Sequence, residues 1–135
     1  MPVTKSPGKA ARPKSTAGRF RIKRIYEPAS KDDGLRVLVD RLWPRGIAKQ
    51  KAHIDLWLRD LSPSDELRRM VHADPAKWGE FVKAYGRELK QEPARTALAD
   101  LRKLSRSQPV TLLYAARDEV HNNAVALQHW LKRAK

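Results

Sequence analysis

Two short segments of the sequence carry most of the side chains that could do chemistry. The first follows the apolar run beginning at Val37 and contains Asp40, Arg41, Trp43 and Arg45. An apolar run that ends abruptly in charged and aromatic residues is typical of a buried strand opening into a polar loop. Ligands of open α/β sheets bind beyond the carboxyl ends of the strands, so we expect a site at this loop.

The second segment follows another apolar run, residues 110–116. It contains Arg117, Asp118, His121, Asn122 and Asn123. If the two predicted strands are parallel neighbours, both segments converge on one edge of the sheet. Guanidinium groups bind phosphate or carboxylate in a bidentate manner, and the start of the following helix adds free backbone N–H groups. The two segments together therefore predict an anion site.

Three functional hypotheses follow from these residues. The first is binding or processing of a phosphate-bearing ligand, a nucleotide or nucleic acid, by a set of six side chains: Arg41, Trp43, Arg45, Arg117, Asn122 and Asn123. The second is a hydrolase-type enzyme with Asp40 or Asp118 as base and His121 as proton shuttle. The third is a non-enzymatic nucleic-acid-binding module that depends on the basic charge of the chain.

Structural roles explain several of the same residues. Asp40 and Arg41 can pair with each other or with neighbours, and Trp43 can plug the core. Asp118 can cap the last helix. Capping is also the first explanation for the two asparagines at positions 122 and 123, because asparagine is a poor interior helix former.

Familiar catalytic signatures are missing from the sequence. It has no glycine-rich dinucleotide or phosphate loop, no nucleophile elbow and no His-Glu-x-x-His motif. His53 with Asp55, and His72 with Asp74, are two positions apart, which does not place both side chains on one face of a helix. We therefore expect neither a metal site nor a cofactor.

Charge and composition limit the class of protein. The 135 residues carry a formal net charge of +14 and contain no cysteine. Such a charge attracts anionic partners, including nucleotides, phosphate and nucleic acid. The lack of cysteine rules out disulfides and thiolate nucleophiles, and fits a cytoplasmic location. No apolar stretch approaches the ~20 residues that span a bilayer, so we expect no membrane partner.

The order of expected elements predicts a single α/β domain at residues 20–135, preceded by a disordered basic tail at residues 1–19. Strands are expected at residues 20–26, 35–42 and 110–116. Helices are expected from about Lys49 to Leu61, after the Ser62-Pro63-Ser64-Asp65 start, after Asp74-Pro75, from Pro93 and from His121. The predicted architecture is a small, mainly parallel sheet of three or four strands packed with about five helices.

The chain also resembles the YeaO-like branch of the DUF488 family of uncharacterised bacterial domains, from about Phe20 to Leu131. The motifs that carry the resemblance are Arg24-Ile25-Tyr26, Asp33-Gly34, residues 36–46, Asp55-Leu56-Trp57, Ser62-Pro63-Ser64, Leu67-Arg68, residues 78–81, Tyr85 and residues 111–118. The resemblance implies a cytoplasmic α/β domain and brings no assigned reaction. Larger relatives have a Cys-rich pattern after the last strand that ends in Cys-His-Arg. The matching residues 117–123 contain no cysteine, so thiol chemistry does not transfer.

Overall fold

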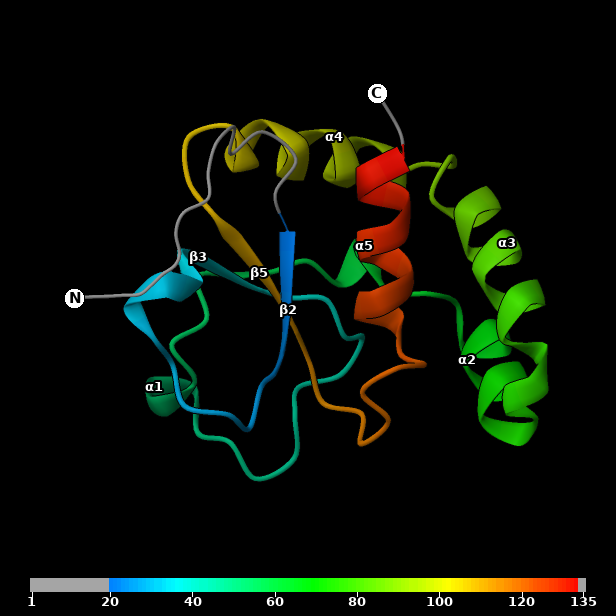
Figure 1. The fold of residues 1–135 in the computed structure, drawn as a ribbon, viewed down its shortest axis with the longest axis horizontal. Coiled ribbons are helices and arrows are strands. Elements are labelled where there is room, and N and C mark those ends of the chain that lie inside the picture. The colour runs from blue at the N-terminus through cyan, green and yellow to red at the C-terminus, as the bar shows by residue number, and fades with distance from the viewer. Residues whose placement is uncertain (1–19, 134–135) are drawn as a thin grey trace.

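Four parallel strands form one sheet in the order β2-β5-β3-β4. The computed structural model describes residues 20–133, and the predicted basic tail at residues 1–19 lies outside them. The strands are β2 (Phe20–Arg24), β3 (Leu35–Leu38), β4 (Leu56–Trp57) and β5 (Val110–Tyr114). The α-helices of the described residues are α1 (Lys49–Ala52), α2 (Asp65–Ala73), α3 (Trp78–Glu88), α4 (Ala94–Ser105) and α5 (Asn123–Arg133) (Figure 1). The predicted α/β class, parallel sheet and helix number are confirmed.

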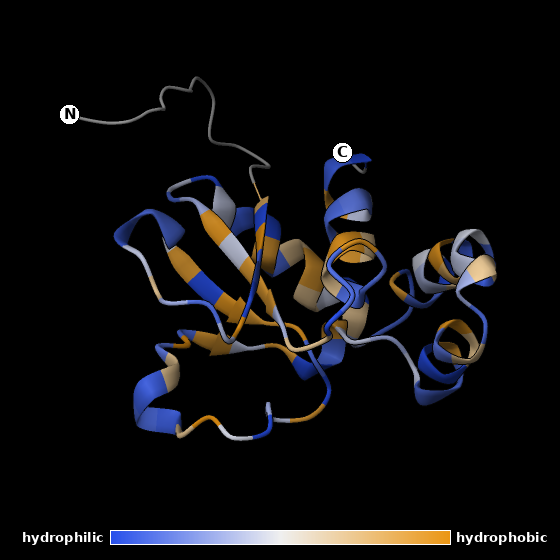
Figure 2. Ribbon diagram, turned by 60° about the horizontal axis from the view of Figure 1, so that its bottom comes forward, coloured by the Kyte–Doolittle hydropathy of each residue, from blue (hydrophilic) through white to orange (hydrophobic). Residues whose placement is uncertain are grey.

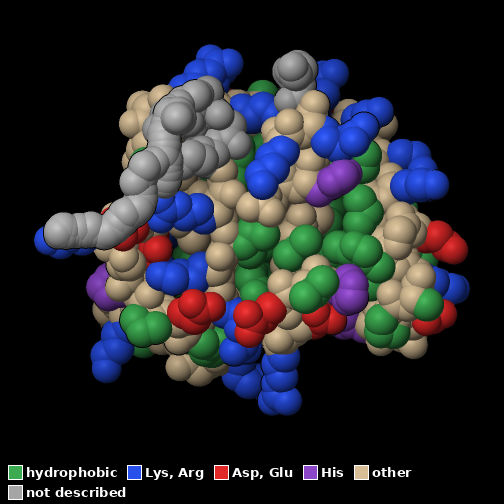
Figure 3. All heavy atoms as spheres, viewed as in Figure 1, with side chains coloured by type: hydrophobic (Ala, Val, Ile, Leu, Met, Phe, Trp, Pro, Cys, Tyr) green, Lys and Arg blue, Asp and Glu red, His purple; other side chains and the backbone are tan. Residues whose placement is uncertain are grey.

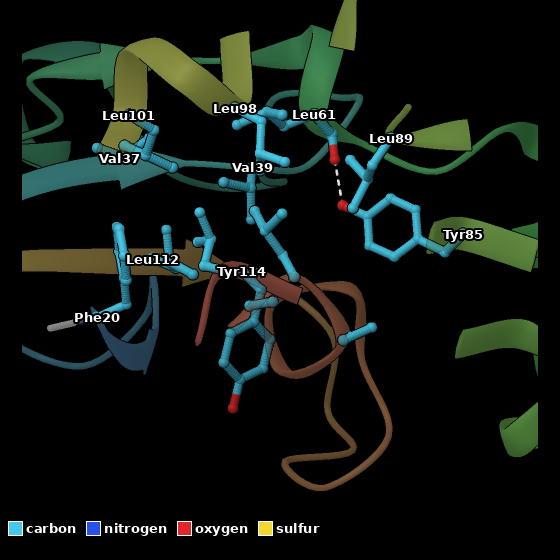
Figure 4. Packing of buried hydrophobic residues seen from close by; sticks show 14 of the residues in the cluster. Phe20, Val37, Val39, Leu61, Tyr85, Leu89, Leu98, Leu101, Leu112 and Tyr114 are labelled. Carbon is cyan, nitrogen blue, oxygen red and sulfur yellow. Dashed lines mark hydrogen bonds between the residues drawn. The ribbon is translucent and has the colours of Figure 1, made fainter. Parts of the chain in front are cut away.

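The central strands β3 and β5 are buried on both faces, as the unbroken apolar run in β3 predicts. Val37 and Val39 belong to the large core shared with the helices, whereas Leu38 belongs to a smaller core. Because successive strand side chains point to opposite faces, these two cores lie on opposite sides of the sheet. Figure 4 shows Leu98 and Leu101 of α4 directed toward the valines of β3. β5 and the valine and leucines of β3 are accordingly among the most hydrophobic parts of the ribbon, whereas β2 is largely hydrophilic (Figure 2).

Helices α2 to α5 pack on the large-core side and against one another. α5 contacts β2 and β5, and α3 contacts both α2 and α5. The hydroxyl of Tyr85 on α3 donates to the carbonyl oxygen of Leu61, which anchors this helix to the segment before α2 (Figure 4). Within residues 20–133, no helix has the length and apolar character needed to cross a bilayer.

Residues 49–61 do not form the continuous helix that their apolar spacing predicts. The helix ends at Ala52, and His53 takes a left-handed φ of 52°. The following residues join the sheet as β4: the N–H of Asp55 donates to the Arg36 carbonyl at 2.8 Å, and the N–H of Leu58 to the Leu38 carbonyl at 2.9 Å. The open edge of β3 thus supplied backbone partners that periodicity alone does not reveal.

Helix starts follow the predicted capping chemistry with one shift. Asp74 accepts from the N–H of Ala76 at 3.1 Å, as the Asp-Pro pair predicts. At α2 the cap is Ser64, which accepts from the N–H of Leu67 at 3.3 Å. Pro63 therefore lies before the cap, whereas the Ser62-Pro63-Ser64-Asp65 pattern predicts it in the first turn, so this prediction is wrong.

A buried carboxylate joins three strands through the turn before β3. Asp33 pairs with Lys23 at 2.9 Å and with Arg36 at 2.5 Å, and the hydroxyl of Thr111 donates to its carbonyl oxygen at 2.7 Å. Burial alone would raise the pKa of Asp33, but the hydrogen bonds from Lys23, the Ser30 backbone and Arg36, with the charge of Lys23, hold it below its usual value. The turn then requires glycine: Gly34 has φ +64°, and a Cβ there would lie 2.2 Å from the carbonyl oxygen of Pro109.

We predict that Gly34→Ala lowers the free energy of unfolding by about 2 kcal/mol or more, because it combines a disfavoured backbone conformation with a clash against backbone. Gly79→Ala is the matched control, since a Cβ at Gly79 on α3 meets nothing within 4 Å. That control should be neutral or stabilising by up to about 1 kcal/mol. Urea denaturation measures the free energy of unfolding of both variants, and equal values for Gly34→Ala and Gly79→Ala would contradict the steric argument.

Candidate functional site

The loops that follow β3 and β5 meet at the carboxyl edge of the sheet. The two strands are parallel neighbours, paired from Leu35 with Val110 to Leu38 with Leu113. A cavity of about 360 Å³ lies where their loops meet. The predicted site residues that line it are Asp40, Arg41, Trp43, Arg45, His121, Asn122 and Asn123. Arg117 and Asp118 are exposed and are not among the lining residues.

The Asp40 carboxylate fastens the two loops together. Its Oδ2 accepts from the backbone N–H of Ala115 at 2.9 Å, just after β5. Its Oδ1 accepts from the Nδ2 of Asn123 at 3.0 Å, and the same amide nitrogen donates to the Val39 carbonyl at 2.9 Å. The indole of Trp57 donates to the Asp40 carbonyl oxygen at 2.8 Å. One residue therefore connects β3, β4, β5 and the start of α5.

Burial dominates the electrostatics of Asp40. Desolvation raises the pKa of its carboxyl above the usual value, and the bonds from Asn123 and Ala115 together with the charge of Arg68 oppose this effect. Burial likewise raises the pKa of Tyr85, with a contribution from the negative charge of Asp40. Both carboxylate oxygens of Asp40 already accept a hydrogen bond from the protein, so its first role is to hold the site together.

Asp118 shapes its own loop. Its Oδ1 accepts from the N–H groups of Val120 and His121, both at 2.9 Å, and its Oδ2 lies 3.3 Å from the Nδ1 of His121. The two backbone bonds are the main reason that its pKa lies below the usual value. The cap of α5 is Asn122, whose side-chain oxygen accepts from the N–H of Val125 at 2.9 Å. The capping explanation thus holds for Asn122 and not for Asp118.

Two ring-bearing candidates, His121 and Trp43, both pack against neighbouring aromatic rings. His121 lies against Trp78 with ring centroids 5.0 Å apart, so α3 and Asp118 fix its position. Trp43 donates from Nε1 to the Ile47 carbonyl at 2.6 Å and meets Trp57 edge-on at 5.3 Å. Trp43 also packs in the smaller core, so it serves as a core plug as well as a cavity wall.

Arg68 on α2 is a lining residue that the search for loop chemistry missed. Its Nη2 lies 3.6 Å from Asp65 Oδ1, and the Nε of Arg41 lies at the same distance from that oxygen. The Nε of Arg68 is buried without a hydrogen-bond partner. The available signal was helical spacing: Arg68 and His72 are four positions apart on one face of α2, and both line the cavity.

Comparison with known proteins identifies the family. The family described as the inactive DUF488-N3 subclade matches residues 19–135. This chain belongs to the DUF488 family. It is 44% identical over 114 residues to the uncharacterised protein YeaO of Escherichia coli strain K12, covering 84% of this chain and 96% of YeaO. No solved structure matches it significantly.

Mycobacterial relatives extend the same likeness. An uncharacterised protein of Mycobacterium bovis and one of Mycobacterium tuberculosis strain H37Rv are each 42% identical over 113 residues, which cover 84% of this chain and 93% of theirs. The resemblance predicted from the sequence motifs is therefore confirmed.

Among residues 20–133, no three metal-ligating side chains gather in a group that could hold a metal ion.

Asp40 and Asp118 are expected to change the pH dependence of stability in opposite directions. The raised pKa of Asp40 means that folding favours its protonated form, so its contribution falls as pH rises from 3.8 through the raised value. The lowered pKa of Asp118 means that its contribution is present above 3.8 and is lost as pH falls through the lowered value.

Urea denaturation of wild type, Asp40→Asn and Asp118→Asn across the carboxylate titration range, about pH 3 to 6, measures this. Asp40→Asn also loses a hydrogen bond, which lowers the free energy of unfolding of this variant by an amount that does not depend on pH in this range. For each variant, the free energy of unfolding of the wild type minus that of the variant is plotted against pH. The two plots should slope in opposite directions, and slopes of the same sign would contradict the opposite pKa shifts of Asp40 and Asp118.

Proposed function

We propose that this protein binds a phosphate-bearing ligand, a nucleotide or nucleic acid, at the carboxyl edge of its sheet and does not catalyse a reaction on it. The observation that carries the proposal is the charge of the cavity wall. Arg41, Arg45 and Arg68 line it, and the one carboxylate among the lining residues, Asp40, already accepts two hydrogen bonds from the protein. Guanidinium groups that converge from separate segments can grip several oxygens of one phosphate.

Arg68 strengthens the proposal because its bonding is incomplete. Buried N–H groups in folded proteins nearly always have a partner, and an exception calls for an explanation. The Nε of Arg68 is buried with no acceptor, and its ion pair with Asp65 is long at 3.6 Å. An anion in the cavity would lie beside a guanidinium group whose hydrogen bonding is incomplete. The start of α5 at Asn123 adds a modest positive potential to the same wall.

Hydrolysis is the second candidate, and one pair of residues favours it. The 3.3 Å contact between Asp118 and His121 is an arrangement that can orient an imidazole, and His121 and Asp40 line the same cavity. Three observations favour binding alone: the matching subclade is described as inactive, Asp118 lies outside the lining, and the oxygens of Asp40 are engaged.

The binding proposal is tested by titrating the full chain with inorganic pyrophosphate, a compact probe that carries phosphate without a base. Arg68→Gln should weaken binding about tenfold or more, because it removes a charge-assisted hydrogen bond to the anion. Arg133→Gln is the matched control: it removes the same charge at the exposed far end of α5. Equal losses of pyrophosphate affinity in Arg68→Gln and Arg133→Gln would show that the effect depends on net charge alone. Failure of the wild type to bind pyrophosphate would refute the proposal.

A turnover assay separates the two candidates. We expect wild type and His121→Ala to show the same background rate with p-nitrophenyl phosphate and with bis-p-nitrophenyl phosphate, because the proposed site only binds. A rate in the wild type that disappears in His121→Ala, while both variants still bind pyrophosphate, would favour the hydrolase instead.

A further inference from the structure

Two strongly exposed apolar side chains, Tyr26 and Leu42, line the basic cavity. Within residues 20–133, the large hydrophobic side chains with strong exposure are Tyr26 at 45%, Leu42 at 69% and Val120 at 64%. Tyr26 and Leu42 line the cavity, and Val120 is the chain neighbour of His121, which also lines it. Single exposed apolar residues need no explanation, but a group of them beside a site marks a surface that a ligand can cover.

The ring of Tyr26 is held in place before any ligand arrives. Its hydroxyl donates to the carbonyl oxygen of Arg45 at 2.8 Å, and the guanidinium of Arg24 lies 4.9 Å from the ring centroid. Arg24 is itself fixed by donating to the carbonyl oxygens of Ala115 and Ala116 at 3.0 and 2.9 Å. A ring fixed in this way loses little conformational entropy when a flat group stacks on it.

The cavity has room for more than a phosphate group. Its volume of about 360 Å³ lies within the range of small-molecule sites, roughly 300 to 1,000 Å³. Apolar side chains complete its wall, among them Pro44, Val71 and Phe81. The wall therefore suits a ligand with one anionic part and one larger part of low polarity.

We infer that the ligand is a single nucleotide, with its phosphate on the arginines and its base against the apolar rim at Tyr26 and Leu42. This inference rests on the proposed function and names its ligand class. Nucleobases stack on aromatic side chains, and phosphates pair with guanidinium groups, so a nucleotide uses both halves of the site. A sugar phosphate would leave the rim uncovered.

Acidic residues beside the cavity favour one nucleotide over an extended strand. Glu27, Asp118 and Glu119 are exposed, lie outside the lining and flank the loops after β2 and β5. Figure 3 shows acidic side chains toward the lower part of the molecule, where these strands end, with basic side chains just below them. Negative charge there repels a phosphate backbone that continues out of the cavity.

Calorimetric titration of the full chain tests the inference with four probes: adenosine 5′-monophosphate, adenosine, ribose 5-phosphate and a 5′-phosphorylated oligothymidylate. The monophosphate should bind at least about fivefold more tightly than ribose 5-phosphate, the lower end of what one stacked base contributes. It should also bind about tenfold or more tightly than adenosine, as a charge-assisted phosphate contact predicts. The oligonucleotide should bind no more tightly per site than the monophosphate.

Two variants at one position separate the ring from its hydroxyl. Tyr26→Ala should abolish the advantage of the monophosphate over ribose 5-phosphate and leave ribose 5-phosphate affinity within about twofold. Tyr26→Phe, which keeps the ring, should retain most of that advantage. Thermal melting verifies that both variants are folded, which the 45% exposure of Tyr26 leads us to expect.

The outcomes distinguish this inference from the proposed function. If ribose 5-phosphate equals the monophosphate and both respond to Arg68→Gln, the phosphate site stands and the nucleotide inference is overturned. If adenosine equals the monophosphate and Arg68→Gln has no effect, the phosphate site itself fails. Tighter binding of the oligonucleotide per site would replace the single nucleotide with a nucleic-acid strand, and no binding of any probe would overturn both.

Discussion

The carboxyl edge of the sheet depends on the Asp40 carboxylate, which sits at the point where three elements meet. It accepts from the backbone after β5 and from Asn123 at the start of α5, while its own chain leaves β3. Burying a charged group is costly unless it is hydrogen-bonded, and these two bonds offset part of that cost. Because they reach separate elements, the same bonds fix how the two loops face each other.

The arrangement of charge in the cavity follows from that constraint. With the carboxylate of Asp40 engaged, the remaining charged groups of the lining are the three arginines at positions 41, 45 and 68. Asp65, in the first turn of α2, lies 3.6 Å from both Arg41 and Arg68 and keeps these side chains near each other without entering the lining. The site therefore combines a rigid anchor with three cations, one of which, Arg68, has a buried Nε without a hydrogen-bond partner.

The parts of the site that could be predicted from sequence are those carried by local pattern. The apolar runs before Asp40 and Arg117 located two strand ends, and parallel pairing of β3 with β5 brought their loops together. Arg68 was missed because it lies on a helix whose spacing describes an ordinary amphipathic surface. Leu56 and Trp57 lie in a segment whose apolar spacing predicts a helix, and only the open edge of β3 selects the strand.

The sequence by itself determined the class of fold, the strand ends, the caps at Asp74 and Asn122, the family and the excess of positive charge, because each depends on neighbouring residues or on composition. Tertiary structure alone decided that Asp40 is a structural tie, that Arg117 lies outside the cavity lining and that Arg68 lies within it. The physical reason is that strand order and the position of α2 bring together groups far apart in the chain. The partners that a polar side chain finds there set its charge, its burial and its role.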